Sequence, residues 1–390
     1  MNKDINNFYK NKLKKIIELD QNRKLIDSFR STESIIIRNK KRLVSFCCND
    51  YLGLTQDNRV IKASINATKK YGTGAGASRL ISGNHELFKK LEKKIAIFKG
   101  EESACIFGSG FLANIGIIPA ISSKNDLILY DELSHASTNL GLKLSHSRIF
   151  KFRHNNILHL RTILKKYRKN YKNCFLLTEG VFSMDGDRSK LKEISILSKQ
   201  YNFSIVLDDA HGFGILGNGR GSQYEIKPFP KTLIQMGTLS KAVGSYGGFI
   251  AGSKIITNLI YNKARSLIYT TGLPPSTIAA SIKSIEIISK DSKLREKPLK
   301  KAILFCKLTN LPKPESCIVS IVLKKEELAI KASNFLEKNG FYVGAIRPPT
   351  VPKNTSRLRF TFTAMQKDKD IIKLANLVNK IIENNKLEKK

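Results

Sequence analysis

Short apolar runs suited to β-strands alternate with helical stretches through the middle of the chain. The helical stretches include 111–121, 155–170 and 190–200. Strands that alternate with helices in this way indicate an α/β fold, with a largely parallel sheet covered on both faces. The expected strands are 103–107, 127–130, 148–152, 173–178, 204–207, 233–236 and 248–252.

The two ends of the chain have a different pattern. Residues 1–30 predict a charged, mostly helical lead-in, and residues 31–46 predict short strands. The Gly- and Ser-rich run at 72–84 predicts a loop. Beyond residue 285, a smaller α+β domain is expected, with strands at 317–323, 341–345 and 357–362 and helices at 325–338 and 367–384. We therefore expect an N-terminal segment (1–46), a large α/β domain (47–285) and a small C-terminal α+β domain (286–390).

Charge is the unusual feature of the composition. Lys and Arg total 68 against 32 Asp and Glu, which gives a formal net charge of +36. A basic surface can bind nucleic acid, but these lysines are spread along the chain instead of forming one recognition element. This spread favours compositional drift, so we expect no nucleic-acid partner. A positive field could still steer an anionic substrate toward its site.

The cysteines and the hydropathy of the chain indicate in which compartment the protein is expected. The six cysteines form no CxxC pair, and none has a histidine at metal-ligand spacing, so we expect reduced thiols and no metal site. The N-terminus lacks the apolar core of a signal peptide. No apolar run approaches the roughly 18 residues that a membrane span needs. These features predict a soluble cytoplasmic protein without a membrane partner.

Three polar motifs each follow a predicted strand, where open α/β sheets place their ligands. Gly108–Asn114 opens a helix whose free N–H groups could bind a phosphate, although a tight turn explains the motif about as well. Asp131–Ser137 contains His135, which could stack on a flat cofactor or simply begin a helix. Thr178–Asp187 contains Ser183, which could hydrogen-bond a ring substituent or belong to an ordinary turn.

Two further motifs carry charged groups suited to catalysis. Asp208 ends an apolar strand and His211 follows three residues later. Asp208 could pair with a protonated ring nitrogen, which makes pyridoxal 5′-phosphate (PLP) an electron sink. A metal held by Asp208 and His211 is the alternative. Lys241 lies among small residues that can desolvate and activate its amine, with Thr238 and Ser240 beside it as candidate phosphate ligands.

In this order, the motifs resemble those of the fold-type-I PLP-dependent enzymes and, among these, the α-oxoamine synthases. The resemblance runs from about Leu19 to beyond residue 375 and rests on NDYLGL, SGFLANIG, DELSHAS, TEGVFSMDGD, LDDAHGFG and GTLSKAVGSYGG. It implies that Lys241 is the Schiff-base lysine, that Asp208 pairs with the pyridine nitrogen and that His135 stacks on the ring. The other roles it implies are ring contacts for His211 and Ser183, with His211 among the catalytic residues, and phosphate-side contacts for Gly110, Phe111 and Thr238.

The run AIRPPTVP at 345–352 differs from the corresponding region of sister synthases such as glycine C-acetyltransferase. The resemblance there implies a decarboxylative condensation of L-alanine with a pimeloyl thioester, carried by coenzyme A or a carrier protein, in biotin biosynthesis. It also implies carboxylate contacts from Asn49 and Arg347 and acyl-chain contacts from Arg30 and Thr350. The segment 268–271 resembles one that reaches the neighbouring subunit, which implies a homodimer. A sister synthase and a fold-type-I aminotransferase are the alternatives.

Overall fold

The computed structural model describes residues 3–19, 21–23, 25–31, 34–227 and 232–387. Contacts between Cα atoms divide the chain into two units, one formed by Asn49–Leu299 and the other by Met1–Cys48 together with Lys300–Lys390. The limits expected at 46/47 and 285/286 differ from these. The two ends of the chain share one unit, and its second limit falls inside helix α11 (Ser292–Leu308).

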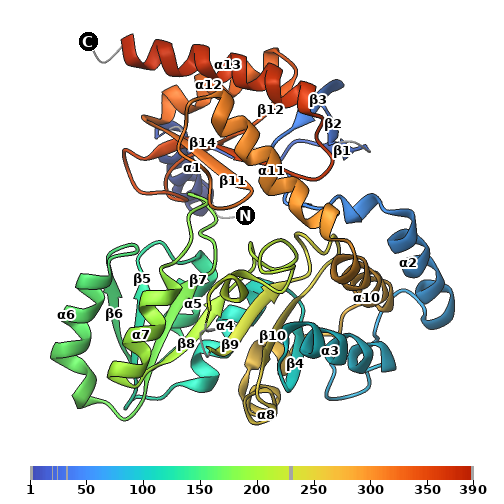
Figure 1. Cartoon of the computed structure of the whole chain (residues 1–390), viewed down its shortest axis with the longest axis vertical. Coiled ribbons are helices and arrows are strands. Elements are labelled where there is room, and N and C mark those ends of the chain that lie inside the picture. The colour runs from blue at the N-terminus through green and yellow to red at the C-terminus, as the bar shows by residue number, and fades with distance from the viewer. Residues whose placement is uncertain (1–2, 20, 24, 32–33, 228–231, 388–390) are drawn as a thin grey trace. The chain divides into compact units, whose positions relative to one another are not determined.

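A seven-stranded sheet forms the centre of the larger unit (Figure 1). Its strand order is β4-β10-β9-β8-β7-β5-β6, and the neighbours from β9 to β6 are parallel. Strand β10 runs antiparallel to both β4 and β9. All seven expected strands are therefore present, and one of them is reversed. Their bounds are β4 Ser103–Phe107, β5 Leu127–Asp131, β6 Arg148–Phe152, β7 Cys174–Glu179, β8 Ser204–Asp208, β9 Thr232–Thr238 and β10 Gly248–Gly252.

Helices cover both faces of this sheet because successive strand residues point to opposite sides. In β5, Ile128 belongs to one apolar cluster, while Leu127 and Leu129 belong to another. The first cluster takes residues from α4, α5 and α8, and the second takes residues from α6 and α7. This confirms the covered α/β sheet. The bounds are α4 Gly110–Ile121, α5 Ala136–Lys143, α6 Ile157–Tyr167, α7 Leu191–Tyr201 and α8 Lys254–Lys263.

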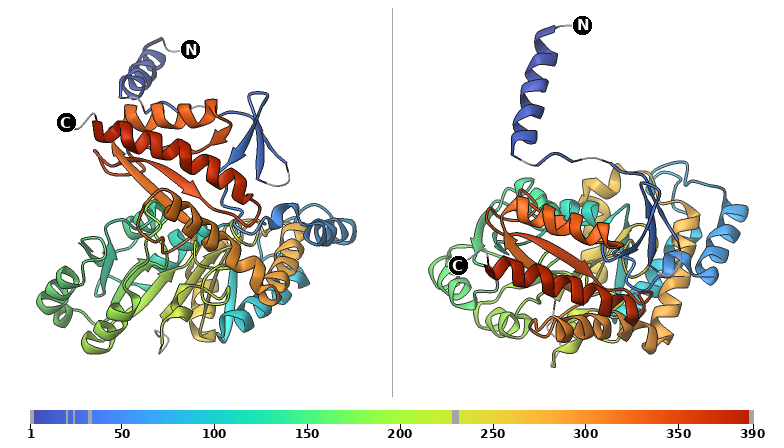
Figure 2. Two further views of the ribbon diagram at one scale, coloured as in Figure 1. Left: turned by 45° about the horizontal axis from the view of Figure 1, so that its top comes forward. Right: turned by 90° about the horizontal axis from the view of Figure 1, so that it is seen from above.

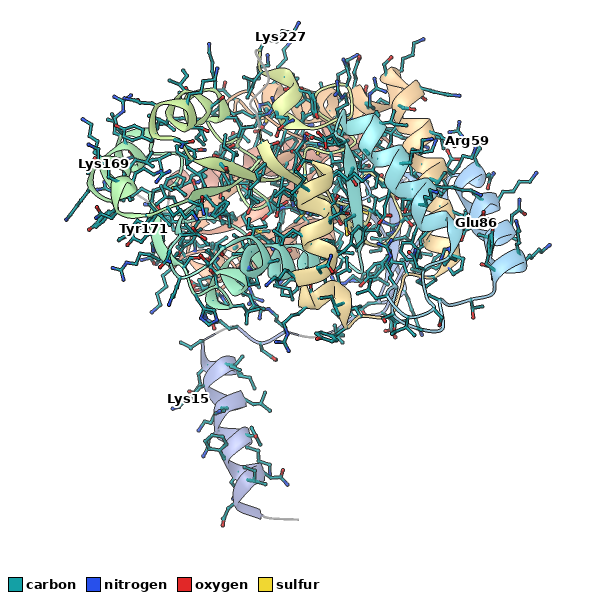
Figure 3. The ribbon with its side chains drawn as sticks, turned by 90° about the horizontal axis from the view of Figure 1, so that it is seen from below. Lys15, Arg59, Glu86, Lys169, Tyr171 and Lys227 are labelled. Atoms are coloured by element: carbon teal, nitrogen blue, oxygen red, sulfur yellow. The ribbon has the colours of Figure 1, made fainter. Side chains whose placement is uncertain are left out.

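Three further helices of the larger unit form one packed group. Helices α2 (Asn58–Tyr71) and α3 (Glu86–Lys99) both pack against α10 (Pro275–Lys290). Basic side chains are carried by separate elements: Arg59 lies on α2, Lys169 on a short 3-10 helix, and Lys227 after another such helix (Figure 3). The charge of this unit is thus distributed over several surface elements, as the spread of lysines in the sequence predicted.

The other unit contains two small sheets. The first has the order β1-β2-β3-β12, and parallel pairing of β3 with β12 joins the two ends of the chain. The second, β11-β14-β13, is antiparallel. Helix α12 packs against its strands and α13 lies beside α12 (Figure 2). The bounds are β1 Ser28–Arg30, β2 Ile35–Arg38, β3 Lys41–Ser45, β11 Ile318–Lys324, β12 Phe341–Tyr342, β13 Gly344–Ile346, β14 Ser356–Thr361, α12 Glu326–Lys338 and α13 Asp368–Leu387.

The N-terminal lead-in contains one helix, α1 (Lys3–Glu18), so the predicted helical segment is shorter than expected. Its side chains, Lys15 among them, are exposed along its length, including the apolar Phe8 and Leu13 (Figure 3). Among the described residues, no helix is both long enough and apolar enough to cross a bilayer.

Candidate active site

Most of the predicted site residues line one cavity of about 220 Å³ in the larger unit. The cavity lies at the carboxyl ends of β7, β8 and β9 and at the start of α4, where a parallel sheet places its ligands. Its lining residues are Ser109, Gly110, Phe111, Asn114, His135, Ser137, Glu179, Asp208, Ala210, His211, Met236, Thr238, Ser240 and Lys241.

Lys241 and His211 are directly bonded in this cavity. The Lys241 Nζ atom lies 2.7 Å from His211 Nε2, and His211 Nδ1 lies 2.5 Å from the hydroxyl of Tyr51. Both His211 and Tyr51 are buried, whereas Lys241 is partly exposed to the cavity. The imidazole can therefore exchange a proton with the amine while the buried phenol fixes the orientation of its ring.

Asp208 provides the negative charge of the cavity. Its Oδ2 accepts a hydrogen bond from Asn114 Nδ2 at 2.7 Å, and its Oδ1 accepts one from the Ala210 amide at 3.1 Å. Two N–H donors therefore hold this carboxylate in place. For neighbouring Glu179, burial and then the charge of Asp208 raise the pKa well above its ordinary value.

His135 begins helix α5 at the side of the same cavity. Its backbone N–H donates to Glu179 Oε1 at 2.6 Å, and its ring Nδ1 lies 2.7 Å from Ser137 Oγ. Desolvation lowers the pKa of His135, with Asp208 opposing and Lys241 reinforcing that shift. The ring is therefore neutral at physiological pH and can present a flat face to a ligand.

The start of α4 faces a pair of hydroxyl groups. Ser109 caps the helix by accepting from the Leu112 amide at 3.1 Å, which leaves the preceding N–H groups for a ligand. Thr238 and Ser240 bond each other through their hydroxyls at 2.8 Å. A Cβ at Gly110 would come within 3.4 Å of Thr238, so this glycine keeps the helix start close to Thr238. The arrangement can bind a phosphate.

Five predicted residues do not line the cavity. Ser183 follows β7, and Asn49 lies 3.5 Å from the Tyr51 hydroxyl, both in the larger unit. Arg30, Arg347 and Thr350 belong to the other unit. There, Arg30 donates to Cys48 Sγ at 2.6 Å, and the Thr350 amide donates to the Arg347 carbonyl at 3.0 Å. Their roles stay predictions.

No role was predicted for Asn114, Ser137, Glu179 or Tyr51, although all four lie in the motifs that carry the resemblance. Asn114 had a visible signal, because it is a polar residue inside an otherwise apolar helix. Glu179 had another, since it ends a strand that is buried throughout. Buried polar groups need hydrogen-bond partners, so each of these residues indicates a polar neighbour in the fold.

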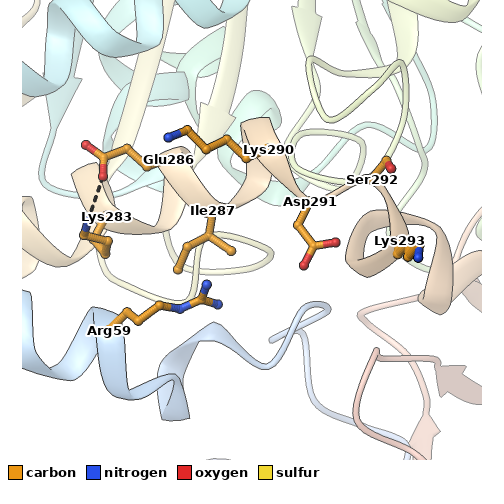
Figure 4. A pocket seen from close by; sticks show the side chains of 8 residues that line it. All are labelled: Arg59, Lys283, Glu286, Ile287, Lys290, Asp291, Ser292 and Lys293. Carbon is orange, nitrogen blue, oxygen red and sulfur yellow. Dashed lines mark hydrogen bonds and ion pairs between the residues drawn. The ribbon is translucent and has the colours of Figure 1, made fainter.

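A second cavity, of about 410 Å³, lies between α2 and α10 (Figure 4). Two of its basic lining side chains are paired with acids: Lys283 bonds Glu286 at 2.8 Å, and Arg59 bonds Asp57 at 2.7 Å. It contains none of the predicted site residues. Among the described residues, no cluster of three or more His, Cys, Asp or Glu side chains is suited to a metal ion.

Comparison with known proteins gives the family. The model of the aminotransferase class I and II family matches residues 41–378. The chain is 46% identical to 8-amino-7-oxononanoate synthase of Granulibacter bethesdensis, over 97% of this chain and 98% of the relative. The chain belongs to the class I and II aminotransferases and, within them, to the 8-amino-7-oxononanoate synthase family.

Solved structures agree with this family. The chain resembles 8-amino-7-oxononanoate synthase from Francisella tularensis with 29% identity and a TM-score of 0.74, over 88% of this chain and 98% of that one. It also resembles serine palmitoyltransferase from S. paucimobilis with bound PLP, with 27% identity and a TM-score of 0.89 over 96% of each chain. The fold-type-I architecture expected from the motifs is therefore confirmed.

The cavity residues fit PLP. The start of α4 with Thr238 and Ser240 offers N–H and hydroxyl donors for a phosphate. Asp208 offers an ionised carboxylate for a protonated pyridine nitrogen, and Lys241 offers an amine for the aldehyde. The donor set thus matches the phosphate, the ring nitrogen and the aldehyde of one cofactor.

Proposed function

We propose that this chain condenses L-alanine with a pimeloyl thioester to give 8-amino-7-oxononanoate, CO₂ and the free thiol carrier, a step of biotin biosynthesis. PLP is the cofactor, and its ring supplies the electron sink for the negative charge that develops at the alanine Cα. The observation that carries the proposal is the convergence of Lys241, His211 and Asp208 in one cavity of a chain nearly half identical to enzymes of that name.

Each cavity residue has a task in this reaction. Lys241 would hold the cofactor through Nζ and, as a free amine, would remove and later return a proton at the alanine Cα. His211, 2.7 Å from Nζ, accepts or supplies a proton as the amine changes charge. Asp208 stays ionised and holds the ring nitrogen protonated. His135 covers one face of the ring and excludes water from it.

The substrate contacts belong to the same proposal. Arg347 and Asn49 hold the alanine carboxylate, and a bidentate guanidinium clamp suits a group that must stay oriented until CO₂ leaves. Arg30 and Thr350 contact the acyl substrate, and Ser183 contacts the ring. A synthase that uses glycine is the alternative function, and the names of the relatives do not favour it.

We also propose a cytoplasmic homodimer. The segment 268–271 would reach the neighbouring subunit, and the ring of Tyr269 within it is 75% exposed in the single chain. Sedimentation of the purified protein tests this assembly. A monomer that keeps full activity at low concentration would contradict it.

The direct test of function mixes purified protein with PLP, L-alanine and pimeloyl-CoA and measures thiol release and the ketone product. In further reactions, glycine replaces alanine, acetyl-CoA replaces pimeloyl-CoA, or both replacements are made together. Product from alanine and pimeloyl-CoA should exceed every other combination, and a preference for glycine with acetyl-CoA would move the chain to the sister synthase. Lys241→Ala should lower turnover at least about a thousandfold. Lys290→Ala, on the exposed side of α10, is the matched control and should leave turnover unchanged.

A further inference from the structure

Asn114 is a buried amide in an otherwise apolar helix. Helix α4 reads GFLANIGIIPAI, and Asn114 is 3% exposed within it. A side-chain amide that loses water must find hydrogen-bond partners in the protein. The partners of Asn114 therefore indicate why the helix carries a polar residue at this position.

Both contacts of the Asn114 amide nitrogen join active-site elements. Its Nδ2 lies 2.7 Å from Asp208 Oδ2, at the end of β8, and 3.0 Å from Ser137 Oγ, in α5. Helix α5 can approach α4 this closely because Gly141 faces the Asn114 carbonyl, where a Cβ would lie only 2.7 Å from the oxygen. The amide thus bridges the two elements that present Asp208 and His135 to the cavity.

The charge of Asp208 fixes the orientation of this amide. If the amide were turned over, its oxygen would lie 2.7 Å from a carboxylate oxygen, and two acceptors at that distance require an extra proton. With the nitrogen facing Asp208, the carboxylate accepts a bond as an ion. The second N–H then donates to Ser137 Oγ.

The Ser137 hydroxyl links this amide to the His135 ring. Its oxygen accepts from Asn114, and its proton can be donated to His135 Nδ1, 2.7 Å away. The Ser137 backbone N–H also donates to Nδ1, at 3.2 Å. An imidazole nitrogen that accepts these bonds carries no proton, so neutral His135 has its proton on Nε2.

We propose that Asn114 is a positioning residue that acts on two active-site groups at once: it donates to and orients the Asp208 carboxylate and, through Ser137, favours the neutral His135 ring with an unprotonated Nδ1. The value of this pattern for catalysis rests on the proposed function, because a protonated cofactor ring needs an anion at its nitrogen and no cation against its face.

The neighbouring charges are consistent with this assignment. Asp208 favours a cation at His135, whereas desolvation and the Lys241 charge disfavour it, and the net effect lowers the pKa of the imidazole. Glu179, which accepts the His135 backbone N–H, is buried, and its pKa is raised well above the ordinary value. Neutral Glu179 adds no charge that would draw a second proton onto His135.

The first test measures the His135 tautomer without cofactor. Nitrogen-15 spectra of the histidine rings are recorded from pH 5 to 9, and His135→Gln identifies the His135 signals. The expected spectrum has an unprotonated Nδ1 and a protonated Nε2 in the wild type, with a mixture of both tautomers in Ser137→Ala. A protonated Nδ1 in the neutral wild-type ring overturns the proposal. This measurement needs neither a folded Asn114 variant nor enzymatic turnover.

The second test measures the Asp208 contact through the affinity for PLP, by equilibrium titration. Asn114→Asp replaces the donor with an acceptor, so affinity should fall at least about tenfold at pH 7.5, the scale of a lost hydrogen bond to a charged group. Asn262→Ala, an exposed amide on α8, is the control and should not change affinity. Unchanged affinity in folded Asn114→Asp would overturn this half of the proposal.

The two outcomes separate the inference from the proposed function. A chain that has the expected His135 tautomer and PLP affinities but makes no 8-amino-7-oxononanoate would refute the function and leave the role of Asn114 intact. A chain that makes this product with His135 protonated at Nδ1 would support the function and refute the proposed role of Asn114.

Discussion

Asp208 and Asp209 are neighbours at the end of β8, yet they lie in opposite surroundings. Asp208 faces the cavity, is partly exposed and receives hydrogen bonds from Asn114 and Ala210. Asp209 is fully buried, with the Ser222 amide 2.9 Å from its Oδ2 and the Lys99 ammonium 3.9 Å from the same atom. One carboxylate is thus available to a ligand, and the other is committed to the interior.

The space around Asp209 is made by three glycines. A Cβ at Gly180, Gly212 or Gly221 would lie 2.2, 2.1 or 1.8 Å from a carboxylate oxygen of Asp209. Gly221 also has a φ of +121°, which favours glycine by itself. These glycines belong to the two motifs that carry Ser183 and Asp208 and to the loop that follows, so Asp209 anchors three active-site segments to one point.

Burial also separates the two acids chemically. Desolvation raises the pKa of Asp209 to about 6 and lowers the pKa of Lys99 to about 8. Both groups are therefore charged near pH 7, and each compensates the other in a region without water. Two adjacent acids in one motif can therefore have different roles. Asp208 is available to a ligand, whereas Asp209 stabilises the buried structure around the site.

The largest effect is expected when the buried pair of Lys99 and Asp209 is broken. Lys99→Met should lower the free energy of unfolding by about 3–5 kcal/mol at pH 7, because it leaves a buried carboxylate without its cation. Denaturant titration measures this loss. The loss should shrink at pH 5, where Asp209, with its pKa raised to about 6, is mostly neutral. Lys290→Met, on exposed α10, is the control. A loss below about 1 kcal/mol at pH 7 would show that the pair is not a structural anchor.

The next variant, at Asp208, should change catalysis strongly and stability little. Asp208→Asn should lower kcat/KM for alanine about a hundredfold or more, because a neutral amide does not hold a ring nitrogen protonated. Its free energy of unfolding should change by less than about 1 kcal/mol, since the side chain is partly exposed and the amide nearly isosteric. Steady-state kinetics and denaturant titration on the same preparations measure both. A variant with near-normal exchange of the alanine α-proton would contradict the assigned role.

A smaller effect tests the glycine packing around Asp209. Gly180→Ala places a methyl group 2.2 Å from Asp209 Oδ1 and 2.3 Å from Ser222 Oγ, so these two buried side chains must move. Such overpacking typically destabilises by about 1–3 kcal/mol. Gly74→Ala, with nothing within 4 Å of its Cβ position, is the matched control. Equal melting temperatures for the two variants would mean that the Asp209 environment adapts without strain.

Much of this architecture was predictable from the sequence, because buried parallel strands are continuous apolar runs and their carboxyl ends carry the polar motifs. Asp208, His211 and Lys241 were found in this way. The direction of β10 was not, since an apolar run has no polarity of its own. Pairing of Lys41–Ser45 with Phe341–Tyr342 was also beyond reach, because no local pattern joins segments three hundred residues apart.

The residues for which no role was predicted contact other polar residues of the protein and orient them or compensate their charge. Asn114 touches Asp208 and Ser137, and Lys99 acts on Asp209, at positions far apart in the chain. A motif identifies groups suited to a ligand, but which protein group orients each of them depends on helix packing. Lys99 in particular occupies the last turn of a Lys-rich helix, where the sequence favours a solvated side chain.

The smallest expected effect concerns His154, which lies between two acids as Lys99 lies beside Asp209. Unlike Lys99, the His154 side chain is 23% exposed. Its Nδ1 lies 2.9 Å from Asp131 and its Nε2 lies 2.8 Å from Asp187, so it ties the end of β5 to the loop that carries Ser183. Although desolvation lowers the pKa of His154, bonds and charges from the two acids outweigh it and raise the value to about 10.

A histidine with a raised pKa stabilises the fold fully below its unfolded value of about 6.5 and loses that contribution as pH rises through about 10. His154→Gln should therefore lower the free energy of unfolding by about 1–2 kcal/mol at pH 6.5, since the pair is partly solvated. The difference from wild type should decline steadily above pH 6.5 and disappear beyond pH 10. Denaturant titrations across this range measure it, with His146→Gln as the control. A difference that does not depend on pH would mean that His154 stabilises the loop by packing against Phe182 and not by its charge.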